Sequence, residues 1–173
     1  MSPASDRTEL VWGVDAGFLQ YIGGLPHGSQ QCFDGCTPVG GEFTFPQREE
    51  SNTVAGEYFF AGGIRFTGHD GLLDLVIAEP AVQKQDGRWV LTAIEPADPS
   101  RISVRSPLAW LPDLVTSVEG TSTHGTSLAP ELTFEGTYLF GNVYRTGHRL
   151  APLTFTADAT RFNQPPKDNR STP

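Results

Sequence analysis

Hydrophobic and polar side chains alternate through the middle of the chain. In GEYFFAGGIRFTGHDGLLDLVIAEPAV, residues 56–82, two runs show this period, at Tyr58, Phe60, Ile64 and Phe66 and then at Leu73, Leu75 and Ile77. A period of two is typical of strands that bury one face. The segments 88–96, 101–110 and 150–162 continue the pattern, and 19 glycines and 14 prolines divide the chain into short pieces. The pattern predicts many short strands joined by turns.

A helical pattern precedes these strands. From Ser5 to Tyr21 the apolar positions are spaced by four, four and three residues, at Leu10, Val14, Phe18 and Tyr21. This spacing lines one face of a helix, which a serine or aspartate at positions 5 and 6 would cap and the glycine pair at 23 and 24 would end. Tyr21 either completes the apolar stripe with its hydroxyl at the surface, or it serves as a ligand.

A weaker helical stripe lies near the end of the chain, in FEGTYLFGNVYRTG, residues 134–147. It is formed by Phe134, Tyr138, Leu139 and Tyr144. Gly136 and Gly141 interrupt it, and each costs about 1 kcal/mol relative to alanine in a helix. A second helix here therefore requires support from tertiary packing.

Length and charge narrow the class of protein. The 173 residues predict one domain, residues 1–162, followed by a polar, flexible tail at 163–173. With 20 acidic and 12 basic residues, the net charge of -8 argues against nucleic acid and anionic membranes as partners. The sequence has no run of 18 apolar residues, which membrane insertion would require. Its N-terminus also lacks the pattern of a secretory signal. We expect a cytoplasmic protein, or an extracellular or cell-envelope protein whose signal has been removed.

The two cysteines, Cys32 and Cys36, lie four residues apart in CFDGC. The spacing fits a small disulfide loop, half of a metal site, or two free thiols in a turn. A tetrahedral zinc site needs two further ligands, and only His27 is nearby in the sequence, so zinc is disfavoured.

Histidine is scarce, and all four histidines adjoin glycine: His27, His69, His124 and His148. Taken singly, each is a surface turn residue by default. The sequence contains no HExxH, P-loop, GxSxG or CxxC motif.

Four motifs carry a family resemblance. WGVDAGFLQYIGG, GEFTFP, GIRFTGHDGLLDLVIAEPAV and LFGNVYRTGHRLAPLTF resemble, in order and spacing, the Htaa domain of actinobacterial haem-uptake proteins, over roughly residues 10–155. The resemblance implies a mainly β fold, an antiparallel β sandwich or roll, with two short α-helices that clasp one haem b.

The resemblance also implies roles for particular residues. Tyr21 is expected to bind the haem iron, and His69 to form a hydrogen bond with Tyr21. Ferric iron favours a hard anionic oxygen, and a histidine partner would orient and tune the phenolate. Further residues are candidates for the haem walls or the propionates: Ser29, Tyr138, Phe140, Tyr144, Arg145, His148 and Arg149.

Two classes of function follow. The first is a haem-binding protein that stores, buffers or transfers haem, with a haem donor or acceptor protein as partner. The alternative is a haem-dependent enzyme, of peroxide-type or specialised-metabolism chemistry, in which His27 or His148 acts on an open distal haem face upon a small-molecule substrate. A third, simpler possibility is that the chain keeps the family fold and has lost haem.

Overall fold

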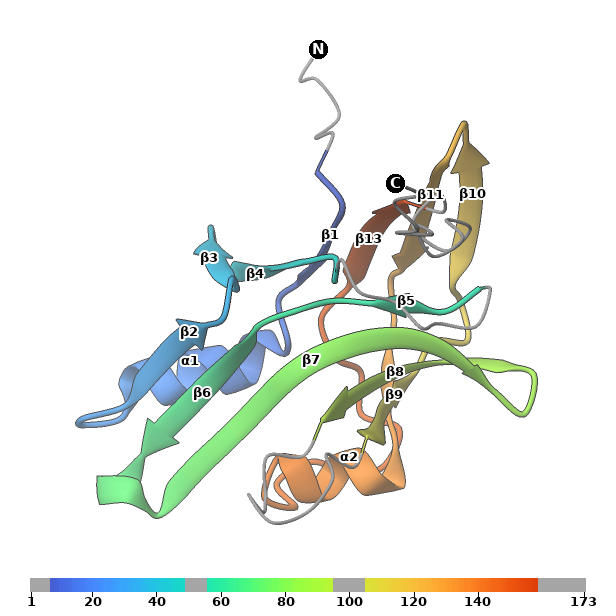
Figure 1. Ribbon diagram of the computed structural model, residues 1–173. Coiled ribbons are helices and arrows are strands. Elements are labelled where there is room, and N and C mark those ends of the chain that lie inside the picture. Colours follow the sequence, from blue (N-terminus) through green and yellow to red (C-terminus); the bar gives the residue numbers. More distant parts are fainter. Residues whose placement is uncertain (1–6, 49–55, 95–104, 159–173) are drawn as a thin grey trace, which may run out of the picture.

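Thirteen strands and two α-helices form the part of the chain that the computed structural model describes, residues 7–48, 56–94 and 105–158 (Figure 1). The strands form two sheets in which every pair of neighbours is antiparallel. The predicted mainly β, antiparallel fold is therefore confirmed.

The first sheet has six strands in the order β10-β11-β13-β1-β4-β3. Its strands are β1 (Glu9–Trp12), β3 (Thr37–Val39), β4 (Glu42–Pro46), β10 (Val115–Glu119), β11 (Ser122–Ser127) and β13 (Leu153–Asp158). The central strand β1 places Leu10 opposite Phe45 on one side and Phe155 on the other.

The second sheet has the order β12-β9-β8-β7-β6-β2, and β5 pairs with β7. Its strands are β2 (Ser29–Phe33), β5 (Tyr58–Phe59), β6 (Gly63–Gly68), β7 (Leu73–Gln85), β8 (Arg88–Ile94), β9 (Arg105–Trp110) and β12 (Glu131–Leu132). The 13 residues of β7 form the long curved band in Figure 1. Its pairing with β8 shifts between Ala78 and Ala81, next to Glu79 with its positive φ of 45°, and such a bulge bends a strand.

Aromatic rings join the two sheets in the core. Phe43 of the first sheet meets Phe66 of the second edge-on, with ring centroids 6.2 Å apart, and Phe155 lies 6.0 Å from Phe60. Edge-to-face pairs of this kind add to the free energy gained by burying the rings. The described residues of segments 56–82, 88–96, 101–110 and 150–162 supply strands of both sheets, as their alternation predicted.

The first helix is shorter than the sequence predicted. Helix α1 spans Ala16–Gly24, and Asp15 caps it by accepting a hydrogen bond of 2.9 Å from the Phe18 N–H. Leu10 belongs to strand β1 instead, and Ser5 lies outside the described residues. The spacing of Leu10 also fits a strand in which Leu10 and Trp12 both face the core. The error arose because pairing with β4 and β13 outweighed the local helical pattern.

Two shorter helical segments complete the fold. Helix α2 spans Phe134–Leu139, and the 3-10 turn η1 spans His69–Gly71. The predicted segment 134–147 is therefore helical only in its first half. Gly136 lies so close to the backbone of Leu108 that a Cβ would come within 2.4 Å of the carbonyl oxygen, so this glycine allows α2 to pack on β9.

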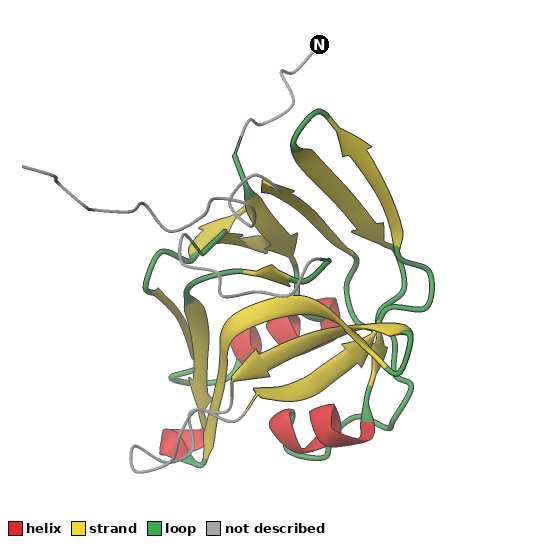
Figure 2. Cartoon of the chain, turned by 45° about the vertical axis from the view of Figure 1, so that its right-hand side comes forward, coloured by secondary structure: helices red, strands yellow, loops and turns green. Residues whose placement is uncertain are grey.

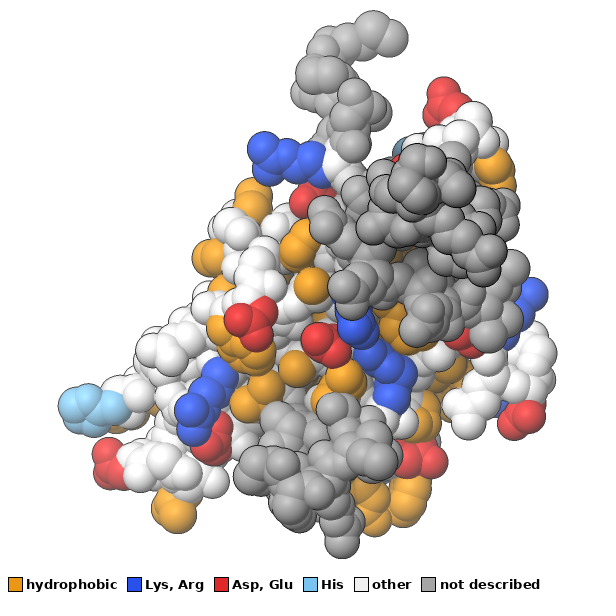
Figure 3. All heavy atoms as spheres, viewed as in Figure 1, with side chains coloured by type: hydrophobic (Ala, Val, Ile, Leu, Met, Phe, Trp, Pro, Cys, Tyr) orange, Lys and Arg blue, Asp and Glu red, His pale blue; other side chains and the backbone are white. Residues whose placement is uncertain are grey.

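Helix α1 lies beside β2 and β6, and α2 lies at the lower edge of the molecule (Figures 1 and 2). On the face shown in Figure 3, acidic and basic side chains of the described residues are interspersed. No helix in the described part of the chain is long and apolar enough to cross a membrane. The predicted tail at 163–173 lies outside the described residues.

We expect Gly125→Ala to destabilise the protein. Gly125 faces Phe155 across β11 and β13, and a Cβ at Gly125 would lie 2.2 Å from the Phe155 ring, which is 2% exposed. Forcing the ring aside should lower the free energy of unfolding by about 1–3 kcal/mol, measured by urea denaturation. The control is Gly23→Ala, at an exposed position of α1 with no atom within 4 Å, which should be neutral or slightly stabilising. Equal stability of the two variants would contradict this packing argument.

Candidate functional site

A cavity of about 730 Å³ lies between α1, the turn before β7, α2 and the segment that follows α2. Its volume is within the range of small-molecule and cofactor sites, about 300–1,000 Å³. Most of its lining is apolar or aromatic, and the lining residues are Phe18, Tyr21, His69, Leu72, Leu73, Asp74, Leu75, Tyr138, Leu139, Phe140, Gly141, Val143 and Tyr144. Two of them are strongly exposed, Leu72 at 92% and Val143 at 73%. Apolar side chains exposed together at a cavity mark a binding site.

The Phe18 ring brings the walls of the cavity together. It is buried, and it meets Phe66 of β6 and Phe140 after α2 edge-on, with centroid distances of 5.1 and 5.3 Å. Because Tyr21 follows Phe18 by three residues, it lies on nearly the same side of α1. The buried Phe18 thus holds Tyr21 at the edge of the cavity.

Tyr21 and His69 form a pair at the cavity wall. The Tyr21 hydroxyl and the His69 Nε2 are joined by a hydrogen bond of 2.5 Å, and Tyr21 is 47% exposed. The residues come from α1 and from the turn after β6, 48 positions apart in the sequence. The imidazole either accepts the phenol proton or donates a proton to the phenolate, depending on its tautomer.

The backbone that presents His69 is unusual. His69, Asp70 and Gly71 all have positive φ, of 51°, 55° and 92°. This conformation is uncommon for residues other than glycine, although histidine and aspartate adopt it more readily than most. It turns the chain sharply between β6 and β7 and directs the imidazole to Tyr21.

Asp15 organises the other side of the cavity. Besides capping α1, it lies with Oδ1 3.2 Å from the Nε2 of His148, whose ring stacks on Tyr144 at a centroid distance of 4.2 Å. Burial, a hydrogen bond with Asp15 and the charge of Asp15 together raise the pKa of Tyr144 to about 12. Asp15 is itself 7% exposed. This one buried carboxylate therefore caps α1, contacts His148 and accepts a hydrogen bond from Tyr144.

The two phenols therefore differ in chemistry. Tyr144 stays protonated, and its hydroxyl donates a hydrogen bond to Asp15. Its oxygen is therefore not a free anionic donor at neutral pH. Tyr21 has a histidine as its partner instead of a carboxylate. An imidazole can share the phenol proton and leave oxygen lone pairs for a cation. Of these two tyrosines, Tyr21 is the better ligand for a hard metal ion such as ferric iron.

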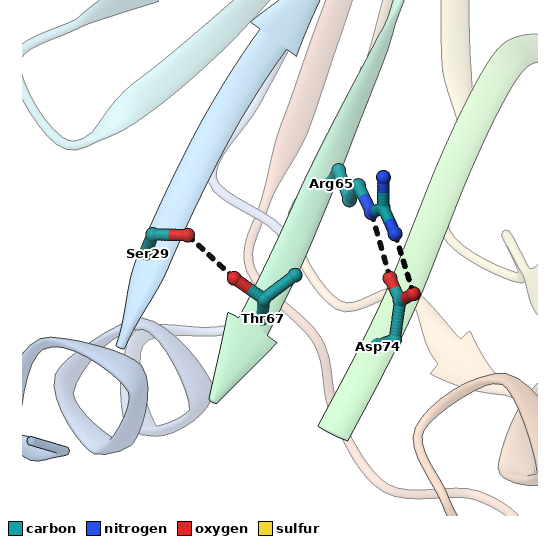
Figure 4. A network of polar contacts seen from close by, with 4 residues as sticks. All are labelled: Ser29, Arg65, Thr67 and Asp74. Carbon is teal, nitrogen blue, oxygen red and sulfur yellow. Dashed lines mark hydrogen bonds and ion pairs between the residues drawn. The ribbon is translucent and has the colours of Figure 1, made fainter. Parts of the chain in front are cut away.

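Arg65 neutralises the carboxylate at the cavity wall. Its guanidinium donates two hydrogen bonds to Asp74, of 2.8 and 2.6 Å, from the neighbouring strand (Figure 4). This ion pair lowers the pKa of Asp74, mainly through the hydrogen bonds from Arg65. Apart from histidine, Asp74 is the one ionised side chain that the described lining contributes, so the cavity suits a largely apolar ligand.

The structure brings together five of the residues named from the sequence: Tyr21, His69, Tyr138, Phe140 and Tyr144 line one cavity. The others do not line it. Ser29 bonds to Thr67 at 2.5 Å on β2 and β6 (Figure 4), and His148 faces Asp15. His27, Arg145 and Arg149 are exposed and are not among the residues that line the cavity.

Sequence reasoning missed Asp15 and the leucine wall of the cavity. Asp15 was placed inside the expected helix, although an aspartate three residues before Phe18 is a typical capping signal. Leu72 and Leu73 are adjacent, and this breaks the alternation of the following strand. That break in the alternation indicates that Leu72 belongs to the turn before β7 and not to the strand itself.

Fold and cavity together define a class of small antiparallel β proteins in which two short helices and a turn border a ligand cavity. Within this class, the chain belongs to the Htaa family, whose sequence profile matches residues 7–156. The resemblance drawn from the four sequence motifs is thus confirmed.

Solved structures agree with this assignment. The chain is similar to the C-terminal domain of HtaA from Corynebacterium glutamicum, with 27% identity, a TM-score of 0.68, and coverage of 88% of this chain and 97% of that chain. The N-terminal domain of HtaA from the same organism gives 23% identity and a TM-score of 0.65, covering 88% and 98%. Heme binding protein HtaB, also from C. glutamicum, gives 22% and 0.60, covering 87% and 91%. Comparison with curated protein sequences gives no match.

We expect Tyr144→Phe to remove a tyrosine whose ionisation is shifted to high pH. Because the pKa of Tyr144 is raised from 10 to about 12, its hydroxyl contributes stability that is complete below pH 10 and is lost as the pH rises toward 12. Ultraviolet titration of tyrosinate should show one group near pH 12 that Tyr144→Phe abolishes, while Tyr138→Phe leaves it. A wild-type curve without any late group would show that Asp15 does not hold the phenol.

Proposed function

We propose that this protein binds haem b in the cavity, with Tyr21 as the axial ligand of the iron, and that it stores, buffers or transfers haem. The observation that carries this proposal is the short Tyr21–His69 hydrogen bond at the wall of a largely apolar cavity of about 730 Å³. The Htaa family membership supports it, and a protein with the same fold, HtaB, is a heme binding protein.

The residues of the cavity fit such a cofactor. When bound, haem supplies a ferric iron that accepts a hard anionic oxygen donor. The Phe18, Leu75 and Phe140 side chains provide apolar surface for the macrocycle, and the exposed Leu72 and Val143 become covered. Tyr138 and Tyr144 extend the wall on the side of α2.

His69 controls the proton of the ligand. In its neutral form the imidazole shares the Tyr21 phenol proton, which raises the anionic character of the oxygen at neutral pH. Loss of that anionic character would weaken the donor and favour release of haem, as a transfer protein requires.

The positions of the histidines support the binding role over the enzymatic alternative. His69 is the histidine that lines the cavity within the described residues. His148 is engaged by Asp15 and Tyr144, and His27 is exposed in the turn after α1 with a positive φ of 61°. An acid–base group for peroxide chemistry would have to reach the open face of the haem. Neither His148 nor His27 lines the cavity, so neither is placed for that role.

The test of the ligand is Tyr21→Phe, which removes one oxygen and leaves the aromatic ring in place. We expect loss of the phenolate charge-transfer band in the visible spectrum of the ferric complex and a fall in haem affinity of more than about 100-fold, because the iron loses its anionic donor. Tyr138→Phe is the matched control, since it removes a hydroxyl from the opposite wall of the same cavity. An unchanged spectrum and affinity in Tyr21→Phe would refute the assignment.

His69→Ala tests the partner of the ligand separately. We expect the charge-transfer band to shift and haem affinity to fall by about 10–100-fold, because the phenolate loses the group that shares its proton. The control is His124→Ala, which removes a histidine bonded to Thr156 on the first sheet. If His69→Ala and His124→Ala gave the same spectrum as the wild type, His69 would have no role in ligation.

A further inference from the structure

A pair of thiols lies outside the candidate haem site. The Sγ atoms of Cys32 and Cys36 are 3.2 Å apart, and both cysteines are free. Cys32 is at the end of β2 and is half-buried, whereas Cys36 follows the next turn and is 8% exposed. Sulfur atoms in direct contact need only a small movement to form a bond, provided that the backbone holds them in place.

The backbone does hold both thiols. The Cys36 N–H donates to the Phe33 carbonyl at 3.2 Å, and the two residues between them, Asp34 and Gly35, have φ of 52° and 97°. An Asp-Gly pair with two positive φ values is the signature of a tight turn. Gly62 packs directly beneath this turn, since a Cβ there would lie 2.7 Å from the Cys36 nitrogen. The turn therefore fixes the two sulfur atoms side by side in the reduced protein.

The two thiols differ in access. A surface hollow of about 660 Å³ beside Cys32 is lined also by Gln31, Phe33, Arg65 and Val76. Cys36 is not part of its lining, and burial together with the hydrogen bond to Cys32 raises the pKa of the Cys36 thiol. Reagents thus meet Cys32 first, with Cys36 directly behind it.

We propose that Cys32 and Cys36 form a reversible dithiol–disulfide site, which takes a low-molecular-weight disulfide as oxidant. The Cys32 thiol gives its proton to solvent, and the thiolate attacks one sulfur of the small disulfide. A mixed disulfide forms, and the first small thiolate leaves and takes up a proton. Cys36 then loses its proton and attacks the Cys32 sulfur, which closes the protein disulfide and releases the second small thiol. Two protein thiols are oxidised and one disulfide is reduced to two thiols.

This site is independent of the proposed haem function. Cys32 pairs with Ile64 near the start of β6, whereas His69 follows the other end of that strand, five residues and roughly 16 Å further on. Neither cysteine lines the cavity. Oxidation should therefore leave haem binding unchanged while it links the two sides of the turn.

The experiment incubates the reduced full chain with oxidised glutathione and follows free thiols and intact mass. We expect the wild type to lose both thiols and two hydrogen atoms in mass, without a lasting glutathione adduct, and to melt at a higher temperature once oxidised. Cys36→Ser should trap one glutathione on Cys32, because the resolving thiol is missing. Cys32→Ser should react far more slowly, because Cys36 is buried.

Several outcomes would overturn the proposal. The wild-type protein could keep both thiols in the presence of oxidised glutathione. Alternatively, it could accumulate the mixed disulfide without forming the disulfide between Cys32 and Cys36. Equal adduct formation in the two serine variants would refute the order of attack. Because the first measurement uses the wild type alone, it decides the proposal even if a variant fails to fold. Haem titration of the oxidised and reduced wild type, with matching affinities expected, separates this site from the haem proposal.

Discussion

The edge-on packing of Phe18 between Phe66 and Phe140 is the interaction on which the candidate site depends. These rings belong to α1, to β6 and to the segment after α2, which share no backbone pairing with one another. Their burial fixes the helices against the second sheet, and the cavity is the space that remains between them. Tyr21 and His69 meet because the elements that carry them meet at Phe18.

Two tyrosines that line the same cavity, Tyr21 and Tyr144, differ in the groups that their hydroxyls contact. Asp15 is buried, and it keeps Tyr144 protonated while it caps α1 and contacts His148. The same carboxylate therefore caps the helix that carries Tyr21 and helps to keep the Tyr144 phenol protonated. Tyr21 has a titratable imidazole as its partner, so its proton can be shared. In the proposed haem site, this asymmetry favours Tyr21 over Tyr144 as the ligand.

The second sheet carries both proposed sites, one at each end of strand β6. Strand β6 leads into the sharp turn that presents His69, and its other end lies against the turn that holds Cys32 and Cys36. Between the two ends of β6, Ser29 forms a hydrogen bond with Thr67, and Arg65 donates hydrogen bonds to Asp74. Cross-strand contacts of this kind keep the strands in register.

Local patterns were sufficient for several strands of the two sheets and for the end of the first helix. Alternation in residues 56–82 marks β6 and β7 because a sheet with one buried face imposes a period of two, and YIGG marks the end of α1 because glycine follows a helix readily. The start of α1 was misplaced, because Leu10 satisfies both periods and its strand partners lie more than thirty residues away. Likewise, the contact of Asp15 with His148 spans 133 positions. Such contacts arise only when the chain folds, since no local spacing encodes which distant side chain a buried carboxylate will meet.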